Sequence, residues 1–209
     1  MRFTILMASP RPKGNTATLL EYFTTELQNL GTEISRFDLY NLQINPCIAC
    51  RTCQFVPNEY GCAFDDDIKD IHEDILRSEC IVLASPIYAW YCTAPMKSAL
   101  DRLIYTMNKY YGETKGKSLW RSKHATIFTS CGYPFDKAVD LFEQGIQRYC
   151  HHSKLFYAGM FAARDPGYKT DFMTEEKAEA AKQFARELHA RLKNNVMSNP
   201  LRVFAEDLR

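Results

Sequence analysis

Short apolar runs alternate with segments of helical periodicity along this chain. Five runs have the length and composition of buried strands, and they lie at residues 3–7, 33–39, 79–85, 124–130 and 154–161. Apolar residues at spacings of three and four predict five helices. Four of them lie at residues 16–30, 93–107, 136–150 and 175–192, and one begins at residues 65–67 and ends at residue 76. Strands and helices are therefore expected to alternate as far as residue 192.

This alternation predicts an α/β fold with a parallel sheet and helices on both faces. The run ECIVLAS at 79–85 is apolar almost throughout, which is typical of a central strand covered on both sides. In such sheets ligands bind at the carboxyl ends of the strands, near the point where the strand order reverses. The loops that follow the strands at 3–7, 79–85 and 124–130 are therefore the candidate binding loops.

Two segments show neither the alternation of a strand nor the periodicity of a helix. Residues 40–64 hold two prolines and predict a long connection, and connections of this length inside compact domains are usually functional. Residues 194–209 form a tail with apolar residues that are expected to pack on the domain or on a partner subunit, namely Leu201, Val203, Phe204 and Leu208. We therefore expect one domain over 1–193, followed by the tail 194–209.

Composition and charge exclude some classes of function. The 209 residues are 46% hydrophobic and 24% charged, as in an ordinary soluble domain. A net charge of +1 creates no broad field for nucleic acid or an anionic membrane, and no apolar run has the length of a membrane span. The chain begins directly with a strand pattern and without a signal peptide, so a cytoplasmic location is expected.

The loop after the first predicted strand reads SPRPKGNT at residues 9–16 and leads into a helix. The first N–H groups of a helix have no intrahelical partner and the helix dipole is positive there, so this arrangement suits a phosphate. The simpler alternative is a polar turn in which Asn15 or Thr16 only caps the helix. The loop matches neither the dinucleotide fingerprint nor the P-loop.

The loop after the strand at 79–85 is rich in aromatic residues. Tyr88, Trp90 and Tyr91 stand where an exposed loop is normally polar. Their rings suit the flanks of a flat aromatic cofactor, whose edge would meet backbone N–H groups of the loop. The alternative is that these rings belong to the core or to a subunit contact.

Taken in order, these motifs resemble the NAD(P)H-dependent FMN reductase and iron–sulfur flavoprotein group of the flavodoxin-like fold. The resemblance covers about residues 1–165. It rests on SPRPKGNT, on SPIYAWY followed by KSALDRL, on a cysteine loop with an Asp-Asp pair after it, and on TSCG at 129–132. It implies a five-stranded parallel sheet of order 2-1-3-4-5, bound FMN, and electron transfer from NADH or NADPH.

The resemblance also assigns the FMN phosphate to the first loop and the flavin ring to the second, and it makes residues 130–132 the third loop of the site. The implied cofactor-binding residues are Ser9, Arg11, Asn15, Thr16, Ala17, Pro86, Ile87, Tyr88, Ala89, Trp90, Ser130, Cys131 and Gly132. Arg11 would offer a planar fork to phosphate. Hydride transfer between nicotinamide and flavin is the chemistry of the cofactors, so no catalytic residue is expected.

Four of the eight cysteines lie close together, at Cys47, Cys50, Cys53 and Cys62. In a chain of this size without a signal peptide, metal binding, redox chemistry or burial is favoured over a disulfide framework. Thiolates at i, i+3 and i+6 can converge on one iron–sulfur cluster, whereas zinc more often uses two separated pairs. The spacing resembles the compact motif of iron–sulfur flavoproteins, but its last gap is longer. A [4Fe-4S] cluster, redox or structural thiols, and zinc therefore all stay open, and no metal ligand is assigned firmly.

The expected function is that of an FMN-dependent oxidoreductase, which passes electrons from NAD(P)H through FMN to a flavin, a quinone or another small acceptor. The alternative is an electron carrier between proteins, although the near-neutral charge argues mildly against docking through one-sign patches. A metal-binding module without flavin is a third hypothesis. A homodimer or higher homo-oligomer is expected, since flavin sites of the resembled group border a second subunit. Nucleic acid and membranes are not expected as partners.

Overall fold

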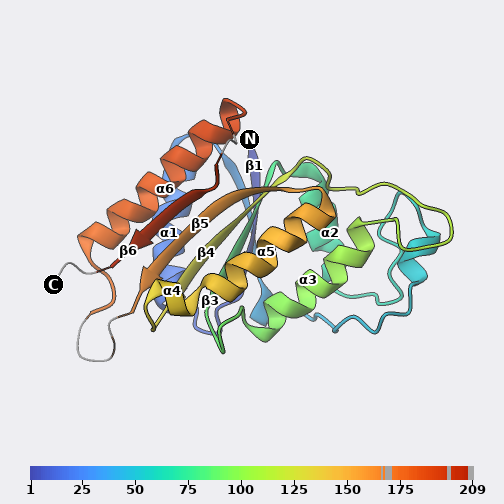
Figure 1. The fold of residues 1–209 in the computed structure, drawn as a ribbon, viewed down its shortest axis with the longest axis horizontal. Helices are drawn as coiled ribbons and strands as arrows, with labels where there is room; N and C mark the ends of the chain where they lie inside the picture. The colour runs from blue at the N-terminus through green and yellow to red at the C-terminus, as the bar shows by residue number, and fades with distance from the viewer. Residues whose placement is uncertain (166, 168–170, 197–198, 207–209) are drawn as a thin grey trace.

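Parallel strands form one central sheet in the computed structural model (Figure 1). The structure describes residues 1–165, 167, 171–196 and 199–206. The strands of the sheet are β1 Arg2–Met7, β2 Glu33–Asp38, β3 Cys80–Pro86, β4 His124–Cys131, β5 Phe156–Arg164 and β6 Leu201–Ala205. Their order is β2-β1-β3-β4-β5-β6 and each neighbouring pair is parallel. The order 2-1-3-4-5 is therefore confirmed for the strands that the sequence predicted, but the prediction of five strands is wrong, because six strands form the sheet in the described part of the chain.

The sixth strand comes from the tail. β6 is short and lies at the edge of the sheet, with Leu201 and Ala205 turned inward and Arg202 and Phe204 exposed. β5 accepts this neighbour through Gly159, which has a φ of +134°. A Cβ at Gly159 would lie 1.9 Å from the carbonyl oxygen of Leu201, so only glycine allows the two backbones to approach. The end of the predicted tail, at 207–209, lies outside the described residues, as do 197–198.

Helices cover both faces of the sheet, as predicted (Figure 1). Their bounds are α1 Asn15–Asn29, α2 Ile68–Arg77, α3 Ala94–Met107, α4 Phe135–Ala138, α5 Asp140–Ser153 and α6 Glu175–Lys193. The single helix expected at 136–150 is thus divided into α4 and α5. In the described part of the chain, no helix has both the length and the apolar composition that crossing a membrane requires.

Each face of the sheet has its own hydrophobic core. Phe3 and Ile5 of β1 pack with Phe23 of α1 and Phe184 of α6 on one face. Leu6 of the same strand belongs to the other core, which α2, α3 and α5 supply. Alternating side chains of a strand point to opposite faces, so an apolar run such as that of β1 serves both cores at once.

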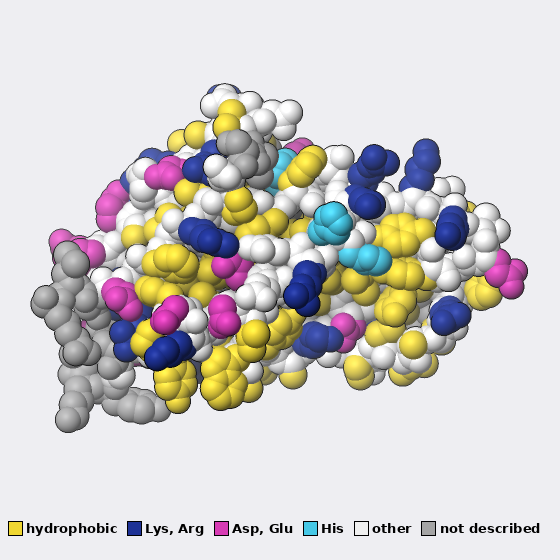
Figure 2. Space-filling view, viewed as in Figure 1, with side chains coloured by type: hydrophobic (Ala, Val, Ile, Leu, Met, Phe, Trp, Pro, Cys, Tyr) yellow, Lys and Arg dark blue, Asp and Glu magenta, His cyan; other side chains and the backbone are white. Residues whose placement is uncertain are grey.

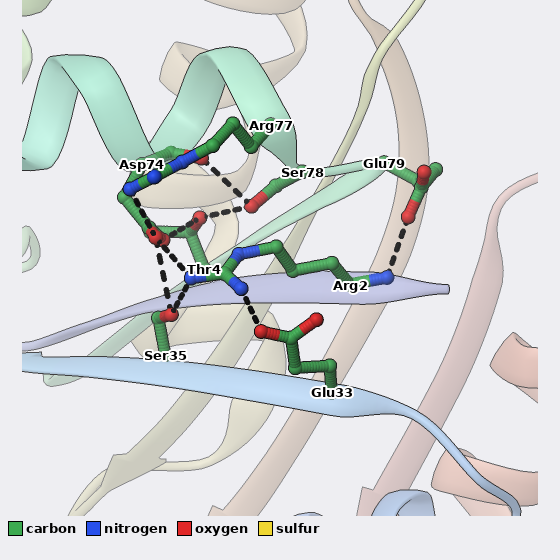
Figure 3. A network of polar contacts seen from close by, with 8 residues as sticks. All are labelled: Arg2, Thr4, Glu33, Ser35, Asp74, Arg77, Ser78 and Glu79. Atoms are coloured by element: carbon green, nitrogen blue, oxygen red, sulfur yellow. Dashed lines mark hydrogen bonds and ion pairs between the residues drawn. The ribbon is translucent and has the colours of Figure 1, made fainter.

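A buried polar network ties the amino end of β1 to α2 and β2 (Figure 3). The side chain of Asp74 is 4% exposed. It accepts hydrogen bonds from Thr4 Oγ1 at 2.7 Å and Ser35 Oγ at 3.1 Å, and it pairs with Arg2 at 2.5 Å. Burial by itself raises the pKa of Asp74, but these hydrogen bonds outweigh it and hold the pKa below its ordinary value. The network lies at the opposite end of the strands from the candidate binding loops.

Candidate functional site

The loops after β1, β3 and β4 meet at the carboxyl edge of the sheet. The three strands are neighbours in the order β1-β3-β4, and the chain leaves β1 toward β2 on one side and returns as β3 on the other. This reversal between β1 and β3 is the switch point at which ligands bind in open α/β sheets. The backbone N–H of Ile87 donates to the carbonyl of Ser130 at 2.9 Å, and the Thr93 hydroxyl donates to the carbonyl of Ala8 at 2.8 Å.

The first loop ends at a helix N-terminus that no side chain caps. Gly14 occupies the N-cap position, and the first turn of α1 contains no acidic residue. A Cβ at Gly14 would lie 2.9 Å from Arg11 Cβ, so glycine keeps the loop closely wound. The N–H groups of residues 15–17 begin the helix and have no intrahelical acceptor. With the exposed side chain of Arg11 beside them, they form a place for an anion.

The structure gives the predicted first-loop residues different roles. Asn15 does not cap α1, because it is the first helical residue and its amide donates to Asp165 Oδ2 at 2.6 Å. Ala17 is buried in a hydrophobic core, so its backbone alone faces the loop. Ser9 forms a local turn through hydrogen bonds with the backbone of Arg11. Asp165, which no sequence pattern indicates as a site residue, follows β5, and its N–H donates to the carbonyl of Cys131 at 2.8 Å.

The second loop holds a strained two-residue turn. Tyr88 and Tyr91 form an antiparallel bridge with hydrogen bonds in both directions. Between them, Ala89 and Trp90 have φ values of 46° and 62°. Positive φ at both central positions is typical of type I′ turns, which favour asparagine and glycine. Strained backbone conformations of this kind persist only where the surrounding structure holds them in place, and they are frequent at ligand sites.

A cleft of about 300 Å³ lies between the second and third loops. Its walls come from predicted residues, with Tyr133 and Ala138 as additions: Ile87, Ala89, Trp90, Cys131, Gly132, Tyr133 and Ala138. Burial raises the pKa of the Cys131 thiol to about 11, so this thiol is protonated at neutral pH. The lining of the cleft does not include the predicted residues Ser9, Arg11, Pro86, Tyr88 and Ser130.

Aromatic side chains project around this cleft. Tyr88, Trp90 and Tyr133 are 48%, 52% and 67% exposed, although their rings are large and apolar. Tyr91, the third aromatic residue of the second loop, instead turns inward and packs edge-on against Phe142, with ring centroids 5.2 Å apart. Figure 2 shows hydrophobic side chains projecting at the lower edge of the molecule, where the strands end. The exposed rings suit a flat ligand or a covering surface.

The cysteine loop lies apart from this cleft, beside the carboxyl-terminal half of α3. It includes the short 3₁₀ helix η2 Thr52–Phe55, and it lies at the right of Figure 1. Gln54 of η2 donates to the carbonyls of Tyr105 at 2.6 Å and Asn108 at 3.0 Å. Arg102 of α3 forms a two-pronged ion pair with Asp66 at 2.8 and 2.9 Å, with both side chains almost fully buried. The cysteine loop therefore packs against α3, which holds it through these contacts.

All four cysteines of the loop line one small cavity of about 20 Å³. Other residues of the loop and of α3, among them Phe64, Arg102, Tyr105 and Thr106, also line it, and none of the thiols is in a disulfide. A hydrogen bond from the Thr52 hydroxyl lowers the pKa of the exposed Cys50, whereas burial raises that of Cys53. Within the described ranges, no three or more His, Cys, Asp or Glu side chains converge closely enough for a single metal ion. The thiols thus share one cavity without forming a one-ion site.

The sequence is similar to a known protein family and to several curated proteins. The model of the family described as NADPH-dependent FMN reductase matches residues 1–141. An iron-sulfur flavoprotein of Archaeoglobus fulgidus is 33% identical over 104 residues, which are 50% of this chain and 46% of that protein. The chain thus spans about half the length of the curated relatives it matches.

Solved structures share the fold at low sequence identity. An NAD(P)H:quinone oxidoreductase from Methanothermobacter marburgensis superposes with a TM-score of 0.66 at 21% identity, over 92% of this chain and 97% of that one. A flavodoxin from the domain Archaea gives 0.56 at 11% identity, over 92% and 99%. At these identities the likeness establishes the flavodoxin-like fold alone.

Proposed function

The chain belongs to the NADPH-dependent FMN reductase family, and from this we propose that it binds FMN at the carboxyl edge of its sheet and transfers electrons from NAD(P)H to a small acceptor. One observation carries the proposal. The cleft between the loops after β3 and β4 is joined to the uncapped N-terminus of α1 by a hydrogen bond between Thr16 and Ser130. A cleft for the ring and a helix end for the phosphate would therefore adjoin, as a flavin with a terminal phosphate requires.

The residues of the first loop would bind the phosphate. The N–H groups of residues 15–17 point from the positive end of α1, and Arg11 adds a guanidinium that can donate two parallel hydrogen bonds. Thr16 and Asn15 hold this end of the helix in place through Ser130 and Asp165. Ser9 shapes the turn that presents Arg11.

The other two loops would hold the flavin ring. Bound FMN would accept a hydride from the nicotinamide and release electrons to the acceptor. The chain's part is to orient the ring, with Ile87, Ala89 and Trp90 on one side of the cleft and Cys131 and Gly132 on the other. Pro86 and Ser130 are opposite each other in the register of β3 and β4, where the two loops begin. The protonated Cys131 thiol places no negative charge beside the ring.

We also propose that the cysteine loop can hold a [4Fe-4S] cluster through Cys47, Cys50, Cys53 and Cys62. The donor set suits one, since four thiols line a single cavity beside the buried Arg102. Ligands of a cluster stand farther apart than ligands of one ion, and the cavity would have to widen to admit it. The iron-sulfur flavoprotein relatives support this reading, while redox-active or structural thiols without a metal remain the alternative.

The exposed rings around the cleft favour a second copy of the chain that covers them, so we propose a homodimer or a higher homo-oligomer.

The proposed acceptor is a small molecule, such as a flavin or a quinone. An electron carrier that docks with protein partners is the second candidate, which the names of the iron-sulfur flavoprotein relatives favour loosely.

An anaerobic visible spectrum tests these proposals. We expect the purified chain to bind FMN and the flavin absorbance to bleach when NADPH or NADH is added. Absence of FMN binding would reject the cofactor site. Binding without bleaching by either nicotinamide would favour the carrier. Iron and sulfide assays on anaerobically purified protein test the cluster separately, and the absence of iron would reject it.

A further inference from the structure

Lys109 is a buried cation beside the cysteine loop. It lies just after the end of α3, and it is 1% exposed. Its ammonium group donates to the carbonyl of Cys53 at 2.9 Å and to the carbonyl of Tyr60 at 3.2 Å. Cys53 belongs to the outgoing arm of the loop, and Tyr60 belongs to the returning arm that leads to Cys62. One side chain thus joins the two arms that carry these cysteines.

No carboxylate in the described part of the chain forms an ion pair with Lys109, although the charge of Glu59 acts on it from farther away. Arg102, seven residues earlier, is neutralised by Asp66. In contrast, none of the ion pairs in the described part of the chain includes Lys109. Burying an ammonium without a counter-ion is costly. Its two carbonyl partners reduce this cost. The groups whose negative charge would favour the ammonium are the sulfurs of Cys53 and Cys62 first, and then the carboxylate of Glu59.

Other contacts already fix the position of the loop. Gln54 donates to two carbonyls at the end of α3, and its own oxygen accepts from the N–H of Tyr111 at 3.0 Å. The Arg102–Asp66 pair anchors the segment near Cys47, because Arg102 also donates to the carbonyl of Asn45 at 2.8 Å. Lys109 is therefore not needed to dock the loop on α3, and its specific contributions are the closure of the two arms and a positive charge.

We propose that Lys109 is a positioning residue of the cysteine loop, which holds the arms of Cys53 and Cys62 together and supplies the positive charge that an anionic iron–sulfur cluster needs. This inference rests on the proposed function of the four cysteines as cluster ligands. The positive charge that would offset the negative charge of the cluster then comes from Lys109, which lies outside the cysteine motif. A positive charge close to a cluster favours its reduced, more negative state, and therefore raises its reduction potential.

The test uses three variants of the full chain, purified anaerobically. Lys109→Met removes the charge at similar volume, Lys109→Arg retains it, and Lys115→Met removes an exposed lysine of the same segment as the matched control. We expect the midpoint potential of the cluster to fall by at least 59 mV in Lys109→Met, which is a tenfold change in a one-electron equilibrium. Lys109→Arg and Lys115→Met should stay near the wild-type potential. An unchanged potential in Lys109→Met with its full iron content would overturn the inference.

A second measurement separates this inference from the cluster itself. If the wild-type chain contains no iron, the cluster proposal fails, but the closure of the arms can still be tested by alkylation followed by mass spectrometry. Cys53 is buried and Cys50 is exposed, so opened arms should speed alkylation of Cys53 at least tenfold in Lys109→Met and leave Cys50 unchanged. Equal Cys53 rates in Lys109→Met and Lys115→Met would overturn the inference. Lys109→Gln replaces Lys109→Met if circular dichroism shows that the latter does not fold.

Discussion

The hydroxyl of Thr16 lies 2.7 Å from the hydroxyl of Ser130, 114 residues away along the chain. Thr16 is in the first turn of α1, and Ser130 is near the end of β4. Both side chains are buried. The contact joins the proposed phosphate loop to the strand that leads into the proposed ring cleft, so this pair contributes to the spacing between the two halves of the site.

Thr16→Val removes the hydroxyl while preserving the shape of the side chain. Because Ser130 would lose its buried partner, we expect FMN affinity to fall about tenfold, which corresponds to about 1.4 kcal/mol. Thr24→Val is the matched control, since the Thr24 hydroxyl bonds to its own helix at an exposed site. Fluorescence titration with FMN compares the two variants, and equal dissociation constants would contradict the role given to this pair.

Arg11→Ala tests whether the first loop binds phosphate. Hydrogen bonds to charged groups contribute about 1.5–3 kcal/mol, so we expect FMN affinity to fall about 10- to 100-fold. Riboflavin lacks the phosphate, and its affinity should not change in this variant. Lys13→Ala is the control, because Lys13 is an exposed cation of the same loop. A loss of riboflavin affinity equal to the loss for FMN would show that Arg11 acts on the ring site instead.

Trp90→Gly tests why the second loop keeps a strained turn. A non-glycine residue with left-handed φ costs about 1–2 kcal/mol, and glycine relieves this cost but adds freedom to the unfolded chain. We therefore expect the free energy of unfolding to change by less than about 1 kcal/mol, while FMN affinity falls about tenfold because a ring face is lost.

Ser122→Gly relieves a similar φ of 67° in the turn before β4, at the other end of that strand, and should leave FMN affinity unchanged. Urea unfolding and FMN titration give the two quantities for both variants. If Trp90→Gly retained wild-type affinity, the strain at this turn would need a reason other than flavin binding.

The sequence predicted the parts of the fold that local pattern controls. The apolar run of β3 and the strand–turn–helix at β1 have local signals, and both candidate loops followed from them. β6 was missed because a five-residue edge strand with Arg202 and Phe204 facing outward has almost no period. The closeness of Asn15 to Asp165, 150 residues apart, has no local signal. Likewise, the cysteine spacing predicted that the four thiols lie together. The position of the Lys109 charge beside them has no local signal, because it depends on how α3 packs against the cysteine loop.

Asp74→Asn tests the network of Figure 3 by its dependence on pH. The pKa of Asp74 is held below its ordinary value in the folded chain. Its stabilising effect is therefore fully present above its pKa in the unfolded chain, about 3.9, and is lost as the pH falls through the lower folded value. At pH 7 we expect Asp74→Asn to reduce the free energy of unfolding by about 2 kcal/mol, since Arg2 would lose its buried partner but keep its ion pair with Glu33. The difference from wild type should shrink as the pH falls below about 4.

Asp38→Asn, which breaks the exposed pair with Arg36, should change stability by less than about 1 kcal/mol at every pH. Urea unfolding between pH 3 and pH 7 measures these values, and a deficit in Asp74→Asn that stayed constant over this range would show that the ionised carboxylate is not what stabilises the network.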